Sequence, residues 1–182
     1  GSEGTLAVIT KIYLRLCPLP QYHRDIWASF PDVQGGLRAL RAIQHSGVQP
    51  AAVEFMDQRC VDAVKAKIEV PFSTDQANSF LVIRLDGRHR TEIAEQKDIV
   101  EALCKQHHAI KITCPESGEE ERSLWEIRRH VSESLSAMGQ AKCSHDITVP
   151  PSKIEVMMQD LHRMKIPGVH VVGYGHLGDG NI

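Results

Sequence analysis

The carboxyl-terminal end of the chain gathers residue types that often carry chemistry. Residues 173–181 read Gly-Tyr-Gly-His-Leu-Gly-Asp-Gly-Asn and follow an apolar run at residues 169–172. Glycines let the backbone turn sharply and approach a planar ligand closely, and His176 supplies an imidazole that titrates near neutral pH and often binds metals. The turn therefore predicts either an acid/base or metal-binding histidine, or an ordinary solvated connection.

A second candidate is an arginine on the apolar face of a predicted helix. The helical stripe within residues 119–138 consists of Leu124, Ile127, Val131, Leu135 and Met138. Arg128 falls inside this stripe and Ser132 lies at its edge. A buried guanidinium is costly without an anion, so Arg128 is predicted to bind either a ligand carboxylate or phosphate, or a buried acid of the protein. Lys142 offers a second cation, or is a plain surface lysine.

The elements that position these residues follow from hydrophobic periodicity and turn signals. Strands are predicted at residues 22–30, 51–56, 78–85 and 109–114, with helices at 33–45, 57–67 and 91–107. This order is typical of a ferredoxin-like α+β domain with one extra helix, in which an antiparallel sheet carries its helices on one face. The predictions continue with a helix at 119–138, a strand at 146–149, a helix at 152–165 and a strand at 169–174.

The amino-terminal residues have a different pattern. Residues 6–16 alternate apolar and polar side chains, which predicts a strand, and Pro18-Leu19-Pro20 then marks a domain boundary. The chain lacks an initiator Met and stops directly after a glycine-rich turn, so we expect it to be a piece of a longer protein.

The composition excludes several classes of protein. With 182 residues, of which 42% are hydrophobic and 24% charged, the chain is globular rather than disordered. Its formal net charge of -2 gives no overall basic field for nucleic acid or anionic membranes. No apolar run approaches the roughly 20 residues that span a bilayer. The 5 cysteines, without a C-x-x-C pair, indicate a reducing compartment and mostly buried thiols.

Three stretches together resemble the FAD-linked 2-hydroxyacid oxidases and dehydrogenases of the vanillyl-alcohol oxidase superfamily. This family includes the glycolate oxidase flavin subunit, D-lactate dehydrogenase and D-2-hydroxyglutarate dehydrogenase. The stretches are GSEGTLAVIT at residues 1–10, DITVPPSKI at 146–154 and GHLGDGN at 175–181, with weaker matches in AVEFMD at 52–57 and LWEIR at 124–128. Their order and spacing cover essentially the whole chain.

The resemblance implies that residues 1–20 end an FAD-binding domain and that residues 21–182 form the substrate or cap domain, truncated at its carboxyl end. The implied FAD contacts are Glu3, Gly4, Thr5, Leu6, Ala7, Val8 and Ile9. The implied substrate-binding residues are Arg128, Ser132, Lys142 and Asn181. His176 would be catalytic and the first ligand of Zn²⁺ or another divalent metal that polarises the substrate hydroxyl. The family's other metal ligands would follow Ile182, and Ser144 stands nearer than Lys142 to the family's lysine position.

The implied activity is oxidation of a small 2-hydroxyacid such as D-lactate, glycolate or D-2-hydroxyglutarate, with hydride passing from its C2 to flavin N5. Electrons would then pass to an electron-transfer flavoprotein, a quinone or a partner subunit. The fragment alone is expected to be inactive, a homodimer is compatible with the family, and the expected compartment is the cytoplasm, or the mitochondrion in a eukaryote. Two alternatives remain: an alkylglycerone-phosphate synthase-like FAD transferase, and a non-catalytic ferredoxin-like binding or dimerisation module.

Overall fold

The computed structural model of the chain describes residues 4–139 and 141–182. Its strands are β1 (Tyr22–Phe30), β2 (Ala52–Asp57), β3 (Ser79–Gly87), β4 (Lys111–Thr113) and β5 (Tyr174–Gly175). Its α-helices are α1 (Val33–His45), α2 (Gln58–Lys65), α3 (Arg90–Gln106), α4 (Gly118–Met138) and α5 (Ile154–Arg163). Short 3-10 turns, η1 (Pro151–Lys153) and η2 (Leu177–Asp179), precede α5 and follow β5.

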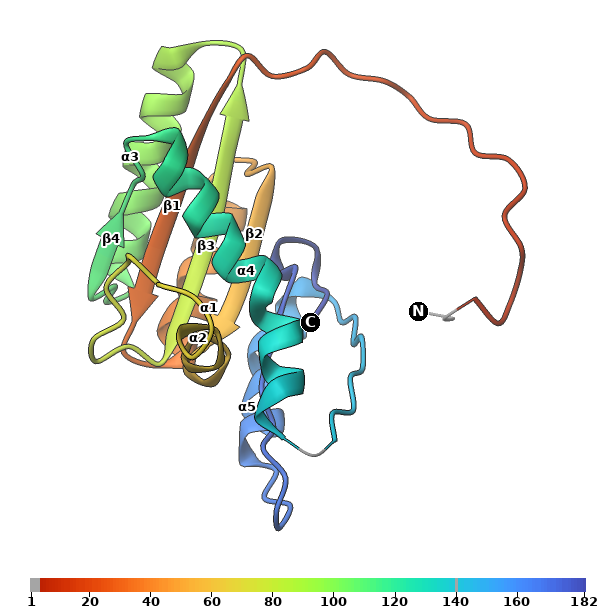
Figure 1. Cartoon of the computed structure of the whole chain (residues 1–182). Coiled ribbons are helices and arrows are strands. Elements are labelled where there is room, and N and C mark those ends of the chain that lie inside the picture. Colours follow the sequence, from red (N-terminus) through yellow and green to blue (C-terminus); the bar gives the residue numbers. More distant parts are fainter. Residues whose placement is uncertain (1–3, 140) are drawn as a thin grey trace.

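The five strands form one antiparallel sheet in the order β4-β1-β3-β2-β5 (Figure 1). The first four strands have the order of a ferredoxin-like unit, in which α1 and α3 cross between strands and α2 is the additional helix. The predicted α+β class with an antiparallel sheet is confirmed. The short strand β5 then extends the sheet beside β2, and this addition brings the carboxyl-terminal turn to the sheet.

The prediction that all helices share one face of the sheet is wrong. Ile26 and Ile83 lie in one core with α1, α3 and α5, whereas Trp27 and Val82 lie in a second core with α2 and α4. Successive strand residues point to opposite faces, so a strand covered on both sides reads as a nearly continuous apolar run. The central strands have this character. Figure 1 shows α4 crossing the face opposite to α3.

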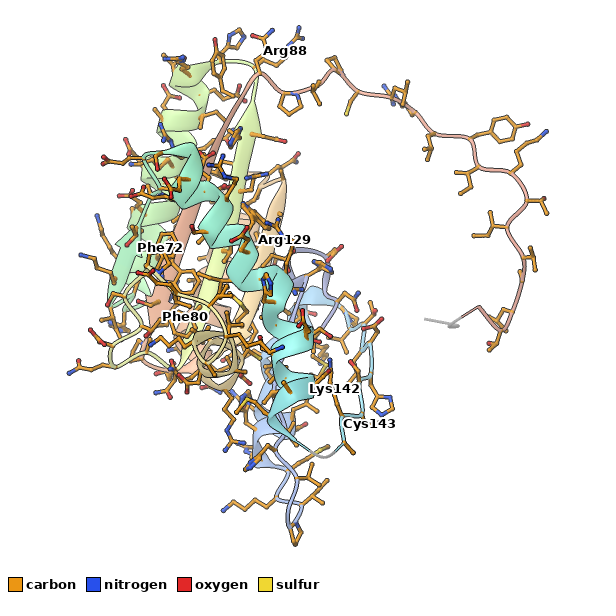
Figure 2. All side chains as sticks on the ribbon, in the orientation of Figure 1. Phe72, Phe80, Arg88, Arg129, Lys142 and Cys143 are labelled. Carbon is orange, nitrogen blue, oxygen red and sulfur yellow. The ribbon has the colours of Figure 1, made fainter. Side chains whose placement is uncertain are left out.

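The core on the α4 side is built around one tryptophan. The Trp27 ring lies 5.5 Å from the Phe72 ring and 4.9 Å from the Phe80 ring, measured between centroids. Phe80 comes from β3 and Phe72 from the connection that follows α2, as Figure 2 shows. Leu124, Ile127 and Val131 of α4 cover this group, so burial of these apolar side chains fixes α4 against the sheet.

Residues 6–16 do not form the predicted strand. Leu6, Val8 and Leu16 are each more than four-fifths exposed, and the segment runs away from the domain (Figure 1). A strand needs a hydrogen-bonding neighbour, and no described strand lies beside this segment. The alternating apolar pattern alone therefore does not give a strand within the described fold.

The carboxyl-terminal strands are shorter than predicted. Residues 146–149 contribute one isolated bridge, from Thr148 to Asn181, and the strand expected at 169–174 is reduced to β5. The thiols also differ from expectation, because Cys17 and Cys143 are exposed while Cys60 and Cys104 are buried. Within the described residues, no helix combines the length and the apolar character needed to cross a bilayer.

Candidate functional site

Helix α4 carries the arginine singled out by the sequence. Ser117 caps the helix by accepting the backbone N–H of Glu120, and three glutamates in the first turn complement the helix dipole. Leu124, Ile127 and Val131 form the buried stripe, while the predicted stripe residue Met138 is exposed. Arg128 adjoins the stripe, and its side chain is only 15% exposed.

Glu54 links the two principal candidates. Arg128 Nε donates to Glu54 Oε2 at 2.8 Å, and His176 Nδ1 lies 2.6 Å from Glu54 Oε1. The Glu54 side chain is 7% exposed, so its charge is neutralised within the protein rather than by water. The structure thus brings Arg128 and His176 together on one buried carboxylate. It also realises the alternative in which an acid of the protein meets the arginine.

The donors that remain on Arg128 decide what this pair can do. Glu54 accepts a hydrogen bond from Nε of Arg128 only. Neither Nη atom of Arg128 has a hydrogen-bond partner within residues 4–139 and 141–182. The guanidinium carbon also lies 5.3 Å from the centroid of the Tyr174 ring, a cation–π contact that limits the orientation of the group. Arg128 therefore has donors to offer a ligand anion while Glu54 and Tyr174 position it.

The carboxyl-terminal turn places His176 by strand register. In the β2–β5 pairing, Phe55 lies opposite Gly175, so the next residue along β5 reaches the level of Glu54. A Cβ at Gly175 would lie 2.5 Å from the Asn181 carbonyl oxygen, and Gly180 has a φ of +83°. These two glycines are needed because the turn folds back on itself closely and passes through the left-handed region.

The state of the histidine follows from its partner. A carboxylate can only accept, so Nδ1 of His176 carries the hydrogen in the neutral ring, and Nε2 holds the lone pair. The His176 side chain is 59% exposed, so Nε2 is open to a ligand. The geometry gives an oriented proton acceptor beside a cation.

The other predicted substrate residues form two contacts near this pair. Lys142 Nζ donates to Ser132 Oγ at 2.6 Å and to the Ser132 carbonyl at 3.0 Å. Figure 2 shows Lys142 on the loop beside the carboxyl-terminal half of α4. The Asn181 backbone N–H donates to the His176 carbonyl at 3.2 Å, and its side chain accepts from Thr148. Ser132 and Lys142 therefore lie together one turn beyond Arg128, and Asn181 lies beside His176.

The predicted FAD contacts lie apart from this site. Glu3 is outside the described residues, and residues 4–9 are exposed on the extended amino-terminal segment (Figure 1). Their exposure leaves them accessible to a cofactor. Neither the hollow lined by Asp57 and Arg59 nor the one lined by Leu37 and Ile154 includes residues 4–9 in its lining.

The described residues around His176 do not complete a binding site for the implied metal. Around His176 the described residues supply no group of three His, Cys or carboxylate ligands, and a divalent ion ordinarily needs three or four from the protein. Among residues 4–139 and 141–182, the one group of three such ligands is elsewhere, at His23, Asp25 and Glu121. Asp25 already accepts two hydrogen bonds from Arg84, so an ion there would compete with a guanidinium. The metal stays a prediction.

Sequence reasoning missed Glu54 and Tyr174. The available signal for Glu54 was a charged residue inside the apolar strand Ala-Val-Glu-Phe-Met, where a buried acid needs a partner. Tyr174 directly precedes the turn motif, but only the β2–β5 pairing shows that its ring faces Arg128.

Comparison with known proteins covers nearly the whole chain. The family described as FAD linked oxidases, C-terminal domain, matches residues 19–182. The chain is 29% identical over 185 residues to glycolate oxidase subunit GlcD of Bacillus subtilis (strain 168), covering 100% of this chain and 38% of that protein. It is 28% identical over 185 residues to mitochondrial D-2-hydroxyglutarate dehydrogenase of Rattus norvegicus, covering 100% of this chain and 34% of the relative.

A plant relative and a solved structure extend the comparison. Mitochondrial D-lactate dehydrogenase [cytochrome] of Arabidopsis thaliana is 29% identical over 184 residues, covering 100% of this chain and 32% of that protein. The chain thus spans about a third of the length of these relatives. An alkyldihydroxyacetonephosphate synthase structure has a TM-score of 0.54 at 17% identity, over 78% of this chain and 29% of that one. At this identity the likeness shows the fold alone.

Proposed function

Because this chain belongs to the FAD-linked oxidases, as their C-terminal domain, we propose that it is the substrate domain of an FAD-dependent 2-hydroxyacid dehydrogenase or oxidase. The observation that carries the proposal is the shared carboxylate of Glu54, which holds Arg128 and His176 side by side. A 2-hydroxyacid has an anionic carboxylate next to a carbon that bears a hydroxyl. A cation with open donors beside an oriented imidazole matches those two groups.

In this proposal, Arg128 binds the substrate carboxylate. Its two Nη atoms can bind the two carboxylate oxygens in fork geometry, because Glu54 occupies only Nε. Ser132 and Lys142, one helical turn further, supply a hydroxyl and an ammonium for the rest of an anionic substrate. Asn181 is assigned to the substrate side of the turn because it is bonded to the His176 backbone.

In this proposal, His176 acts on the substrate hydroxyl. Its Nε2 lone pair accepts the hydroxyl proton, while the bond from Nδ1 to Glu54 fixes the ring and stabilises the imidazolium that results. The FAD implied by the family accepts the hydride that leaves C2 when the cofactor is bound. Glu54 is a positioning residue, since it holds both groups and contacts neither reacting atom.

The remaining assignments concern the parent protein. We propose that residues 1–20 complete the FAD-binding domain, in which the exposed apolar side chains of residues 6–16 would be covered, and that Glu3 to Ile9 contact FAD. The metal stays a prediction as the alternative in which His176 Nε2 binds an ion instead of accepting the proton. The electron acceptor, the homodimer and the compartment also stay predictions. The domain alone is expected to be inactive, because residues 1–20 represent only the end of the proposed FAD-binding domain.

The test uses the full-length protein under anaerobic conditions. It should be yellow, and its absorbance near 450 nm should bleach on addition of D-lactate, glycolate or D-2-hydroxyglutarate. The substrate that bleaches it fastest identifies the acid, and the matching L-acid serves as the control for chiral substrates. A colourless protein, or a flavin that none of these acids reduces, would contradict the proposed function.

A further inference from the structure

A hollow of about 450 Å³ lies at the carboxyl end of β2, between the start of α2, the end of α5 and the segment that follows α5. Glu54, Arg128 and His176 do not line it. We propose that this hollow is a second ligand site, which binds a small organic anion with an apolar body. Its volume lies within the range of small-molecule sites, about 300 to 1,000 Å³.

The polar lining presents donors. Arg59 Nη1 lies 2.9 Å from His170 Nδ1, and because a guanidinium can only donate, Nδ1 must be the acceptor. The ring hydrogen of His170 therefore lies on Nε2, which makes that atom a donor. Lys165 lines the same hollow and has no partner within residues 4–139 and 141–182. Two cations and one imidazole donor thus surround the space.

The one acid in the lining is already satisfied by the protein. Asp57 is buried, and its two carboxylate oxygens accept the backbone N–H groups of Cys60, at 3.0 Å, and Gly173, at 2.7 Å. His162 Nε2 lies 3.9 Å from the second of these oxygens. The carboxylate therefore ties α2 to the segment that leads into β5, and two cations outnumber it at the hollow.

The rest of the lining defines the ligand further. Gln58 Nε2 donates to Asp62 Oδ1 at 2.6 Å, which fixes the amide orientation and leaves Oε1 buried without a partner in the described part of the chain. Because this oxygen is buried, it is not available to a ligand in the hollow. Ile166 and Val169 add apolar surface. The matching ligand combines a carboxylate or phosphate with an apolar body.

The test uses the fluorescent probe 8-anilinonaphthalene-1-sulfonate, which joins a sulfonate to aromatic rings. Its binding to the full chain is titrated by fluorescence, and the double variant R59M/K165M is expected to bind at least about ten-fold more weakly, because two charge-assisted contacts are lost. The control K153M/R163M removes the same charge from exposed positions outside the hollow. The control should bind as the wild type does.

Competition identifies the anion. Hexanoate and hexyl phosphate should displace the probe from the wild type, the more effective of the two showing which anion the site prefers, whereas hexanol should not. Equal affinity of the two double variants, or displacement by hexanol as readily as by hexanoate, would overturn the proposal. Arg59 and Lys165 are exposed, so unchanged thermal unfolding of R59M/K165M confirms that the fold is intact.

Discussion

Two acid–arginine pairs lie between α4 and the sheet, and they differ in what they leave open. Asp25 on β1 is fully buried and accepts both Nε and Nη2 of Arg84, at 2.7 and 2.6 Å. Trp125 donates its indole N–H to the same carboxylate at 2.8 Å, and its ring lies 4.7 Å from the Arg84 guanidinium carbon. The carboxylate side of this pair is closed by its own neighbours, and the hydrogen bond to Asp25 raises the pKa of Arg84 above its usual value.

The pair of Glu54 and Arg128 also joins a carboxylate to a guanidinium, but it leaves polar atoms without partners. Glu54 binds Arg128 through Nε alone and gives its second oxygen to His176. Both Nη atoms of Arg128 and Nε2 of His176 remain without a partner in the part of the chain that the structure describes. The comparison teaches that the difference lies in what each carboxylate holds: Asp25 binds an arginine and a tryptophan N–H, whereas Glu54 holds an arginine beside an imidazole whose Nε2 stays open.

The largest effect on stability is expected at the closed pair. The substitution Arg84→Met leaves the buried Asp25 carboxylate with only the Trp125 N–H, so the free energy of unfolding should fall by about 3 kcal/mol. Chemical denaturation of the chain measures this change. Arg88→Met removes an exposed arginine at the end of the same region, labelled in Figure 2, and should change stability little. Equal losses in the two variants would break the comparison.

The largest effect on activity is expected at the open pair. In the full-length enzyme, Arg128→Met should lower kcat/KM at least about 30-fold, because it removes a charge-assisted contact to the substrate. The neighbouring Arg129→Met is the control, since Arg129 is exposed on α4. If Arg128→Met keeps wild-type kcat/KM but loses as much stability as Arg84→Met, then the second pair is also structural.

A smaller effect on activity is expected at the bridging acid. Glu54→Gln keeps the shape of the side chain but removes the charge shared by Arg128 and His176, so kcat/KM should fall about ten-fold through loss of positioning. Steady-state kinetics with Glu126→Gln, an exposed glutamate of α4, provide the control. A wild-type value for Glu54→Gln would show that Arg128 and His176 are positioned by other contacts.

The smallest effect is expected at a surface pair. Lys97 Nζ lies 2.9 Å from Glu101 Oε1, and this hydrogen bond lowers the pKa of Glu101 below its usual value. The folded state therefore gains stability above the unfolded pKa near 4.5, and loses it as pH falls through the lower folded pKa. Lys97→Met should cost about 0.5 kcal/mol at pH 7, and less near pH 3 or in high salt. A cost above that of Arg84→Met would reverse the proposed ranking.

Local sequence signals predicted the helices and central strands well. Helix α1 begins after Asp32, whose side chain accepts the Gly35 N–H at 2.6 Å, and buries Leu37, Leu40 and Ile43 at the predicted spacing. These features depend on residues within one or two turns. The single-face prediction was wrong because the ferredoxin-like order fixes the strand order, whereas only the apolar residues on both sides of β1 reveal a second covered face.

The site was predictable in part. An arginine beside an apolar stripe and a histidine in a glycine turn mark Arg128 and His176, but their meeting depends on Glu54, which is 74 and 122 residues away from them along the chain. That contact arises from the pairing of a two-residue strand with β2, which carries almost no local signal. Residues 6–16 show the same limit, since their alternating pattern predicts a strand but no described strand pairs with them.

The most direct measurement of the central claim compares two substrates in two enzymes. The rate of anaerobic flavin reduction is measured for the preferred 2-hydroxyacid and for its uncharged amide, in the full-length wild type and in Arg128→Met. If the Nη atoms of Arg128 bind the substrate carboxylate, the wild type should prefer the acid at least about 30-fold and the variant should lose most of that preference. An unchanged preference in Arg128→Met would contradict the account.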